Sequence, residues 1–225
     1  MKKLATILLA SITLVACTQT KKSETLTEHL QQPVKSSLSF HEIYTPGDYM
    51  DAIAKLAPEN TFRIGFANSP IAGYVVAADT ARFMEAMRTD SAHMALPEDC
   101  SVMLGQFKAD IPEEEGELYN VYLVKTSKSQ SLWNPTLNDI YVSDETFAGS
   151  PVIALQFGEK DTKQWATMTR MNIGRFIAIV MDNHTLCVPR VVMEISNGAA
   201  SITGKFSTEE AVSIVNKIAG RTLAE

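Results

Sequence analysis

Four segments in the last third of the chain have the pattern of strands. Residues 151–157 and 176–181 are almost continuously apolar, which is typical of buried strands. Residues 186–195 and 201–206 predict two more strands, and Pro189 indicates an edge or a bulge because it has no N–H to give to a ladder. Short polar turns separate several of these segments, so we expect neighbouring strands to run antiparallel.

Two helices are expected in the same third of the chain. The first begins at Asp161 or Thr162, and its inward-facing apolar residues are Trp165, Met168 and Ile173. The second follows residues 207–210, Ser-Thr-Glu-Glu, in which a serine and a glutamate three positions later form a capping box. Gly220 is expected to end this helix, because glycine readily takes the left-handed conformation at a helix C-terminus.

Shorter elements precede this region. We expect one helix opened by residues 45–48 and another capped by Asp79. Further strands are expected over residues 61–67, 71–77, 101–107 and 118–125. Helices and strands are interleaved, and tight turns join several strands. This pattern predicts the α+β class, with helices packed on a mixed, largely antiparallel sheet.

The amino terminus has the features of a secretory signal. Two lysines after the initial methionine precede an apolar run over residues 4–16, which is too short to span a bilayer because a spanning helix needs about 20 apolar residues. The run ends in Leu-Val-Ala-Cys17, which resembles the lipobox of bacterial lipoproteins. We therefore predict that residues 1–16 are a lipoprotein signal peptide and that acyl chains on Cys17 anchor the protein in membrane lipid. An ordinary signal peptide followed by a chance cysteine is the alternative.

Residues 17–39 are polar and show no sustained period, so we expect a disordered tether between the lipid and the folded part. Position 18 is threonine rather than aspartate, which by resemblance to enteric sorting rules favours the outer membrane over the inner. We therefore expect the cell envelope as the location. The lipid is expected to be the only anchor, because no second apolar run reaches spanning length.

The charge balance argues against nucleic acid as a partner. The chain of 225 residues carries 20 Lys and Arg against 26 Asp and Glu, for a formal net charge of −6. An acidic chain does not follow phosphate backbones, and the sequence has no stripe of Lys and Arg with interleaved aromatic residues.

Two cysteines follow Cys17, and two interpretations of them are open. Cys100 and Cys187 would form a disulfide in an oxidising compartment, or they would be separate buried thiols. We favour separate thiols, since the sequence does not give the distance between them.

The sequence has no pattern of catalytic, cofactor-binding or metal-binding residues. Its histidines lie far apart without ligand-spaced partners, so no zinc site is expected at His29, His41, His93 or His184. Nor would His184 and Cys187 readily face each other across a turn and a strand. A nucleophile elbow, a phosphate-binding loop and a metalloprotease motif are all missing. We therefore expect neither an enzyme nor a cofactor.

Several of these features occur together in one known family. Residues 165–182 contain a threonine, an Asn-x-Gly at 172–174 and an apolar strand that ends in aspartate. Pro189 follows a short hairpin, and residues 202–211 contain Ile-Thr-Gly before a capped helix. This order resembles the head subdomain of the first periplasmic domain of SecD and fused SecDF, which are accessory subunits of the Sec protein translocase.

The resemblance extends over residues 70–225 and implies a SecD periplasmic-head-like fold there. Residues 40–69 would then be a small base-like α/β segment. In the family, the periplasmic domain is thought to contact the emerging preprotein, while proton-driven work depends on transmembrane helices. Because the sequence ends at Glu225, where SecD would enter the membrane, we expect no coupling to a proton gradient.

The resemblance implies a non-enzymatic, membrane-tethered lipoprotein that binds extended or unfolded polypeptide and assists Sec-dependent export or envelope protein biogenesis. Its partners would be unfolded secretory proteins or Sec translocase components. An extended chain would add to a sheet edge, and we predict that edge at Cys187, Val188, Pro189 and Arg190. The alternative is a structural or assembly lipoprotein that binds one folded envelope partner.

Overall fold

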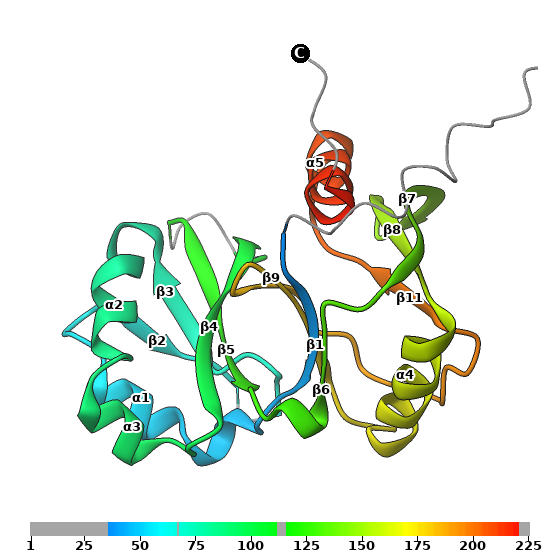
Figure 1. Cartoon of the computed structure of the whole chain (residues 1–225). Helices are drawn as coiled ribbons and strands as arrows, with labels where there is room; N and C mark the ends of the chain where they lie inside the picture. The colour runs from blue at the N-terminus through cyan, green and yellow to red at the C-terminus, as the bar shows by residue number, and fades with distance from the viewer. Residues whose placement is uncertain (1–35, 67, 112–115, 221–225) are drawn as a thin grey trace, which may run out of the picture.

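The computed structural model describes residues 36–66, 68–111 and 116–220. They form two sheets with helices packed against them (Figure 1). The larger sheet has the strand order β2-β3-β5-β4-β10-β9-β1-β6, and the smaller has β11-β8-β7. Among the strand pairs of the described residues, only β4 and β10 run parallel. The predicted α+β class with a mixed, largely antiparallel sheet is therefore confirmed.

The strands are β1 (Leu38–Glu42), β2 (Phe62–Ile64), β3 (Gly73–Val76), β4 (Cys100–Lys108), β5 (Leu118–Lys125), β6 (Ser131–Trp133), β7 (Leu137–Phe147), β8 (Ser150–Phe157), β9 (Ile177–Met181), β10 (His184–Cys187) and β11 (Ala199–Ile202). The α-helices are α1 (Met50–Leu56), α2 (Thr80–Ala86), α3 (Asp90–Ala95), α4 (Glu159–Met171) and α5 (Thr208–Ala219). In the described part of the chain, none of these helices has the length and apolar character that crossing a membrane would require.

In the first half of the chain, α1, α2 and α3 pack against β3, β5 and β4 (Figure 1). Ile53 of α1 shares one apolar core with Val75, Phe83 and Leu123. Ile53 belongs to the segment 40–69 that we expected to be base-like, and the other three belong to the expected head. The structure therefore joins the two predicted units in one core.

The middle of the larger sheet curls back on itself. β5, β4, β10, β9 and β1 are neighbours in that order. The chain after β1 then returns to β5, because Ile43 forms a bridge with Val124 and the Tyr44 N–H donates to the Leu123 carbonyl over 2.8 Å. The ring encloses mainly apolar side chains, which include Met103, Tyr122, Val124, Ala178 and Val180.

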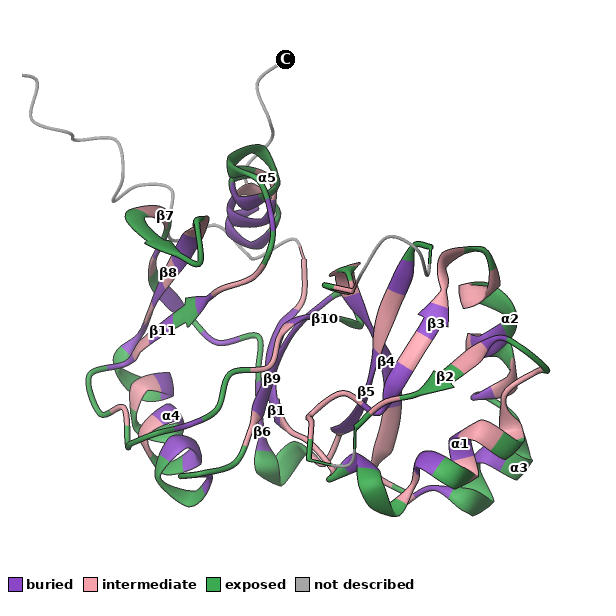
Figure 2. Cartoon of the chain, turned by 180° about the vertical axis from the view of Figure 1, so that it is seen from behind, coloured by how far each residue is buried: buried purple, intermediate pink, exposed green. Residues whose placement is uncertain are grey.

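The second half of the chain packs α4 and α5 against the smaller sheet. Three buried rings meet there: Phe40 of β1 lies 5.2 Å from both Phe157 of β8 and Trp165 of α4, edge to face. Trp165 and Met168 are buried as predicted. Ile173 was expected to face inward but is 52% exposed, because α4 ends before it, at Met171. Buried residues are dense along β9 and β1, where the two halves meet (Figure 2).

The turn between β9 and β10 and the cap signals of α5 are confirmed. Asp182 and Asn183 both have positive φ, 48° and 64°, as in a tight hairpin turn between β9 and β10. Ser207 Oγ accepts the Glu210 N–H, and the Glu210 carboxylate accepts the Ser207 N–H, so the capping box of α5 is complete. Gly220 ends the helix at φ 68°.

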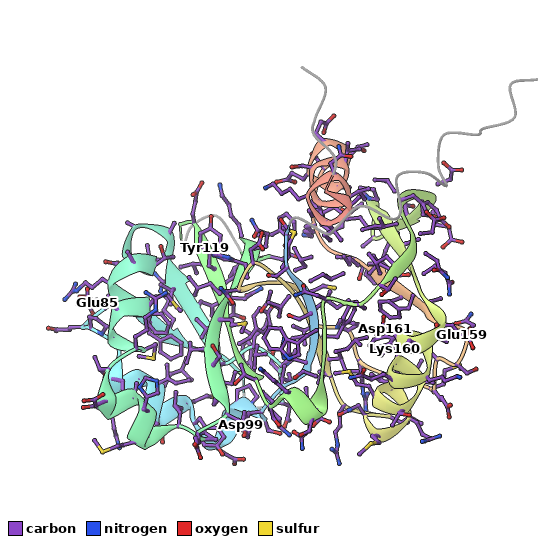
Figure 3. The ribbon with its side chains drawn as sticks, viewed as in Figure 1. Glu85, Asp99, Tyr119, Glu159, Lys160 and Asp161 are labelled. Carbon is purple, nitrogen blue, oxygen red and sulfur yellow. The ribbon has the colours of Figure 1, made fainter. Side chains whose placement is uncertain are left out.

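The caps expected for the other helices are not formed by the predicted side chains. α4 begins earlier than expected, after Gly158, so Asp161 lies in its first turn instead of before it. There Asp161 Oδ2 accepts the Thr136 N–H over 2.8 Å and ties the helix to the loop before β7 (Figure 3). Thr45 and Asp79 precede helical turns, but neither side chain caps one.

Strands β1, β6 and β7 have no predicted counterpart. Leu38 and Ser39 of β1 fall inside the expected tether 17–39, yet both are buried. The folded part therefore begins earlier than expected, because β1 is held by its partners β9 and β6. Ser37 adds two hydrogen bonds to Asp182 Oδ1, from its N–H over 2.9 Å and from its hydroxyl over 3.1 Å.

The expected signal peptide 1–16, Cys17, His29 and most of the tether lie outside the described residues.

Candidate functional site

Of the four residues predicted to form a free strand edge, which are Cys187, Val188, Pro189 and Arg190, the structure pairs three with β9 or the residue before it. Cys187 is in β10, between β4 and β9. Beyond it, the Pro189 carbonyl accepts the Ile177 N–H over 3.1 Å, and Arg190 forms a bridge with Phe176. One side of this segment is therefore occupied, and the peptide-binding edge stays a prediction. A proline in the sequence does not show which segments flank it.

The predicted strand 186–195 is also interrupted at this point. β10 ends at Cys187, and the chain turns to the loop after α4. The Val191 N–H donates to the Arg175 carbonyl, and the Gly174 N–H donates to the Val191 carbonyl. These two bonds fix the following residues beside the end of α4.

An exposed apolar patch results from this arrangement. Its members lie on the end of α4 and on the loop held against it: Met171, Ile173, Val192 and Met193. Val192 is 76% exposed and Met193 is 64% exposed. An ion pair between Arg170 and Glu194, 4.0 Å long, borders them. Exposed apolar side chains close together on a surface are a feature typical of interaction sites.

The two described cysteines are free thiols. Thr185 of β10 pairs with Gly105 of β4, so Cys187 lies beyond Gly105 while Cys100 is at the start of β4. At about 3.3 Å per strand residue, the two cysteines are on the order of 20 Å apart, well beyond the reach of a disulfide. Burial raises the pKa of both thiols to about 12.

His184 and Cys187 do not form a nucleophile pair. His184 Nδ1 lies 3.1 Å from the Asp182 carbonyl, while the backbone of Thr203 provides the hydrogen bond to the Cys187 sulfur. In the described ranges, moreover, no group of three His, Cys, Asp or Glu side chains is arranged to hold a metal ion.

His41 belongs to a closed polar network that the sequence does not reveal. Its Nδ1–H donates to the Lys125 carbonyl over 2.9 Å, beside Ser131 Oγ, and its Nε2 accepts the Ser39 hydroxyl over 2.8 Å. Burial lowers the pKa of His41, and the hydrogen bond to Lys125 offsets this only in part. The histidine and both serines are at most 3% exposed, so a substrate has no access to them.

A cavity of about 350 Å³ lies between α2, α3 and β4, with the β9–β10 turn on its far side. Part of its wall is apolar and includes Met87, Leu96 and Val102. Its polar lining residues include His93 of α3 and His184, the first residue of β10. The fold thus brings together two histidines that the sequence separates, and no motif in the sequence marks the cavity.

Two acidic residues adjoin this cavity without lining it. Figure 3 labels Glu85 of α2, whose side chain points away from the molecule, and Asp99, directly before β4. Asp99 accepts a hydrogen bond from the Tyr44 hydroxyl, and burial together with this bond raises the pKa of Tyr44. The residues that line the cavity include Arg88 but no Asp or Glu.

Comparison with known proteins connects half of the chain with one family. Residues 111–224 match the family model described as SecDF, P1 head subdomain. The protein translocase subunit SecD of Rhodothermus marinus is 30% identical over 143 residues, which are 64% of this chain and 22% of that protein. SecD of Acidaminococcus fermentans is 45% identical over 64 residues, 28% of this chain and 15% of that protein. The chain thus spans less than a quarter of the length of these relatives.

Solved structures of SecDF are similar to the chain at a coarser level. The crystal structure of SecDF in its super-membrane-facing form is 20% identical, with a TM-score of 0.44, over 85% of this chain and 20% of that one. A structure of SecDF, described as a membrane component that enhances protein export, is 18% identical, with a TM-score of 0.39, over 83% of this chain and 94% of that one.

The family match includes residues 165–182 and 202–211, which carry the resemblance seen in the sequence, and it confirms that resemblance. It begins at residue 111, so α2, α3 and β4 precede it, whereas the apolar patch lies within it. Because the matched residues make up just over half of the sequence, the chain belongs to the family of SecDF P1 head subdomains.

Proposed function

We propose that this chain is a non-enzymatic domain that binds extended or unfolded polypeptide outside the cytoplasm. Acyl chains on Cys17 tether it to a membrane, with the outer membrane favoured, and it assists Sec-dependent export or the biogenesis of envelope proteins. Family membership supports a role related to protein translocation, since the relatives are subunits of the protein translocase.

The apolar patch formed by Met171, Ile173, Val192 and Met193 carries this proposal. It lies in the residues that match the SecDF head, and all four side chains are more than half exposed. Methionine is unbranched and polarizable, so it adapts to apolar partners of different shape. A surface of this kind suits polypeptides of varied sequence better than one fixed ligand.

The chemistry of the described residues supports a binding role without catalysis. A pKa of about 12 keeps the Cys100 and Cys187 thiols protonated at neutral pH, and a protonated thiol is a poor nucleophile. The network of His41, Ser39 and Ser131 has the atoms of a nucleophile and a base, but it is closed to substrate.

Site-specific photo-crosslinking in cells tests the proposal. A photoreactive amino acid replaces Met193 in the patch, and the matched control replaces Lys163, which is 80% exposed on the first turns of α4. We expect position 193 to form adducts with many secretory proteins or with Sec components, and position 163 to form few. Adducts with a single stoichiometric folded protein would favour the assembly role instead, and equal adducts from both positions would refute binding at the patch.

Metabolic labelling with a fatty acid tests the tether separately. The wild-type protein should incorporate the label and fractionate with membranes, and a Cys17→Ser variant should do neither. Label in the variant would show that the anchor is elsewhere.

A further inference from the structure

Within the described ranges, the first half of β4 has a strand on only one side. β5 pairs with it over Cys100 to Leu104, whereas β10 meets it at the single pair Thr185–Gly105. Before His184 the chain turns away through Asn183 into β9. Among the residues that the structure describes, none therefore forms a neighbouring strand beside residues 100–104 on the side where β10 would lie if it were longer.

In the ladder between β4 and β5, hydrogen bonding alternates along β4, so some backbone groups of β4 point toward the side on which the structure describes no strand. The Asp99 carbonyl accepts the Thr126 N–H over 2.7 Å. In an antiparallel ladder, hydrogen-bonded and non-hydrogen-bonded residues alternate, so Ser101 and Met103 bond to β5. The N–H and C=O groups of Val102 then point the opposite way, toward the side that β10 does not reach.

The cavity borders this edge and not just one face of the strand. Successive strand side chains point to opposite faces: Val102 and Leu104 belong to the core beside α2, and Met103 belongs to the ring interior. All of residues 100–104 nevertheless line the cavity. Only the edge of a strand presents consecutive residues to one space, so the cavity occupies the position of a missing neighbouring strand.

The rest of the lining suits a peptide. Met84 of α2, Met87 directly after that helix and Leu96 after α3 form a flexible apolar wall. Arg88 is the one charged residue that is always ionised in the lining, which contains no Asp or Glu although the whole chain has a net charge of −6. The charge therefore favours neutral or acidic peptides over basic ones. A volume of about 350 Å³ is within the range of ligand pockets.

We propose that this slot, bounded by residues 100–104, by α2 and by the turn at Asn183, takes up a short stretch of extended polypeptide as an added strand. In this mode, main-chain hydrogen bonds provide affinity and pockets for alternate side chains provide selectivity. A lipid tail has no donors and acceptors to meet the backbone of Val102. The inference rests on the proposed function and names a contact for it outside the residues that match the SecDF head.

The test measures the binding of a fluorescent peptide of alternating leucine and serine to the full chain in mild detergent. Val102→Pro removes the edge N–H and places a ring in the slot, while the bonds to β5 stay in place. We expect affinity to fall by at least about tenfold, a change of about 1.4 kcal/mol. Val102→Ile is the matched control, because it keeps the N–H and the apolar side chain, and its affinity should stay within about twofold of wild type.

Two further measurements keep the test independent of the fold of one variant. Met84→Trp fills the slot from the helix side without changing β4, and it should also weaken binding. Circular dichroism checks that each variant is folded. A peptide with N-methyl groups at alternate residues has lost its strand-pairing donors, so wild type should bind it about as weakly as Val102→Pro binds the unmodified peptide.

The outcomes separate the slot from the proposed function. If folded slot variants bind the peptide as well as wild type while position 193 still crosslinks to secretory proteins, the slot is refuted and the function stands. If wild type binds no peptide and position 193 gives no specific adducts, both fail. A third measurement places a photoreactive residue at position 93, in place of His93. The inference is also overturned if this residue reacts with residues 18–35 of the same chain, or with a second copy of the chain, instead of with the peptide.

Discussion

Replacing Phe40 with alanine should destabilise the protein strongly. The Phe40 ring is fully buried where β1 meets the smaller sheet and α4, and it contacts Phe157 and Trp165 with centroids 5.2 Å away in each case. Truncating a buried phenylalanine to alanine costs about 3–5 kcal/mol, and each aromatic contact adds about 0.5–1.5 kcal/mol beyond the buried area. We expect a loss near the upper end of that range, about 4–5 kcal/mol. This is a large part of the roughly 5–15 kcal/mol of a typical domain.

Urea unfolding followed by circular dichroism measures this loss. Tryptophan fluorescence is a poor probe here, because Trp165 is one of the rings in contact with Phe40. Phe147→Ala is the matched control: Phe147 is 60% exposed at the end of β7, so its loss should cost less than about 1 kcal/mol. If both variants lost the same stability, β1 would not be part of the core, and the integration of residues 38–42 into the fold would be refuted.

Three further predictions follow from single sites. Ser207→Ala should lower the free energy of unfolding by about 1 kcal/mol through loss of the capping box, measured by thermal or urea unfolding, whereas no change would show that the cap is not formed in solution. Burial lowers the pKa of His41 below 6.5, so the unfolded chain binds a proton at this histidine more readily than the folded chain does. The contribution of His41 to the free energy of unfolding should be complete above about pH 6.5. It should fall as the pH drops toward the folded pKa, by up to about 1.4 kcal/mol per pH unit. Urea titrations between about pH 7 and 5 measure this slope, which His41→Asn should abolish and which a flat wild-type profile would contradict. With pKa values of about 12, Cys100 and Cys187 should react with iodoacetamide at pH 8 roughly a thousandfold more slowly in the native protein than in urea, and equal rates by mass spectrometry would show that the thiols are exposed.

Features that depend on near neighbours in the sequence could be predicted. The capping box at Ser207 and the turn at Asp182 and Asn183 are satisfied within a few residues, so their residue types suffice to identify them. Trp165 and Met168 recur at helical spacing and are buried.

Strands β1 and β7 could not be predicted, because their stability comes from distant partners. Leu38 is buried by pairing with β9, far along the chain, although its own neighbours are polar. β7 carries Asp144 and Glu145 and reaches its length only by pairing with β8. The strand propensity of single residues and a short hydrophobic period do not show which distant strand a segment pairs with.

The candidate sites depend on tertiary structure in the same way. A free strand edge is defined by the absence of a neighbour. Pro189 does not show that one side of its segment is paired with β9, and the edge beside Val102 has an ordinary apolar sequence. The patch around Met193 forms only because a loop is held against the end of α4.

Hydrogen–deuterium exchange of the full chain, with and without an excess of a reduced and alkylated unfolded protein, tests the binding of extended polypeptide most directly. We expect the amide of Val102 to exchange more slowly when the polypeptide is present, because it would gain a hydrogen-bond acceptor. Protection is also expected near Val192 and Met193, where the patch would be covered. Unchanged exchange at both places, under saturating polypeptide, would contradict the proposed function.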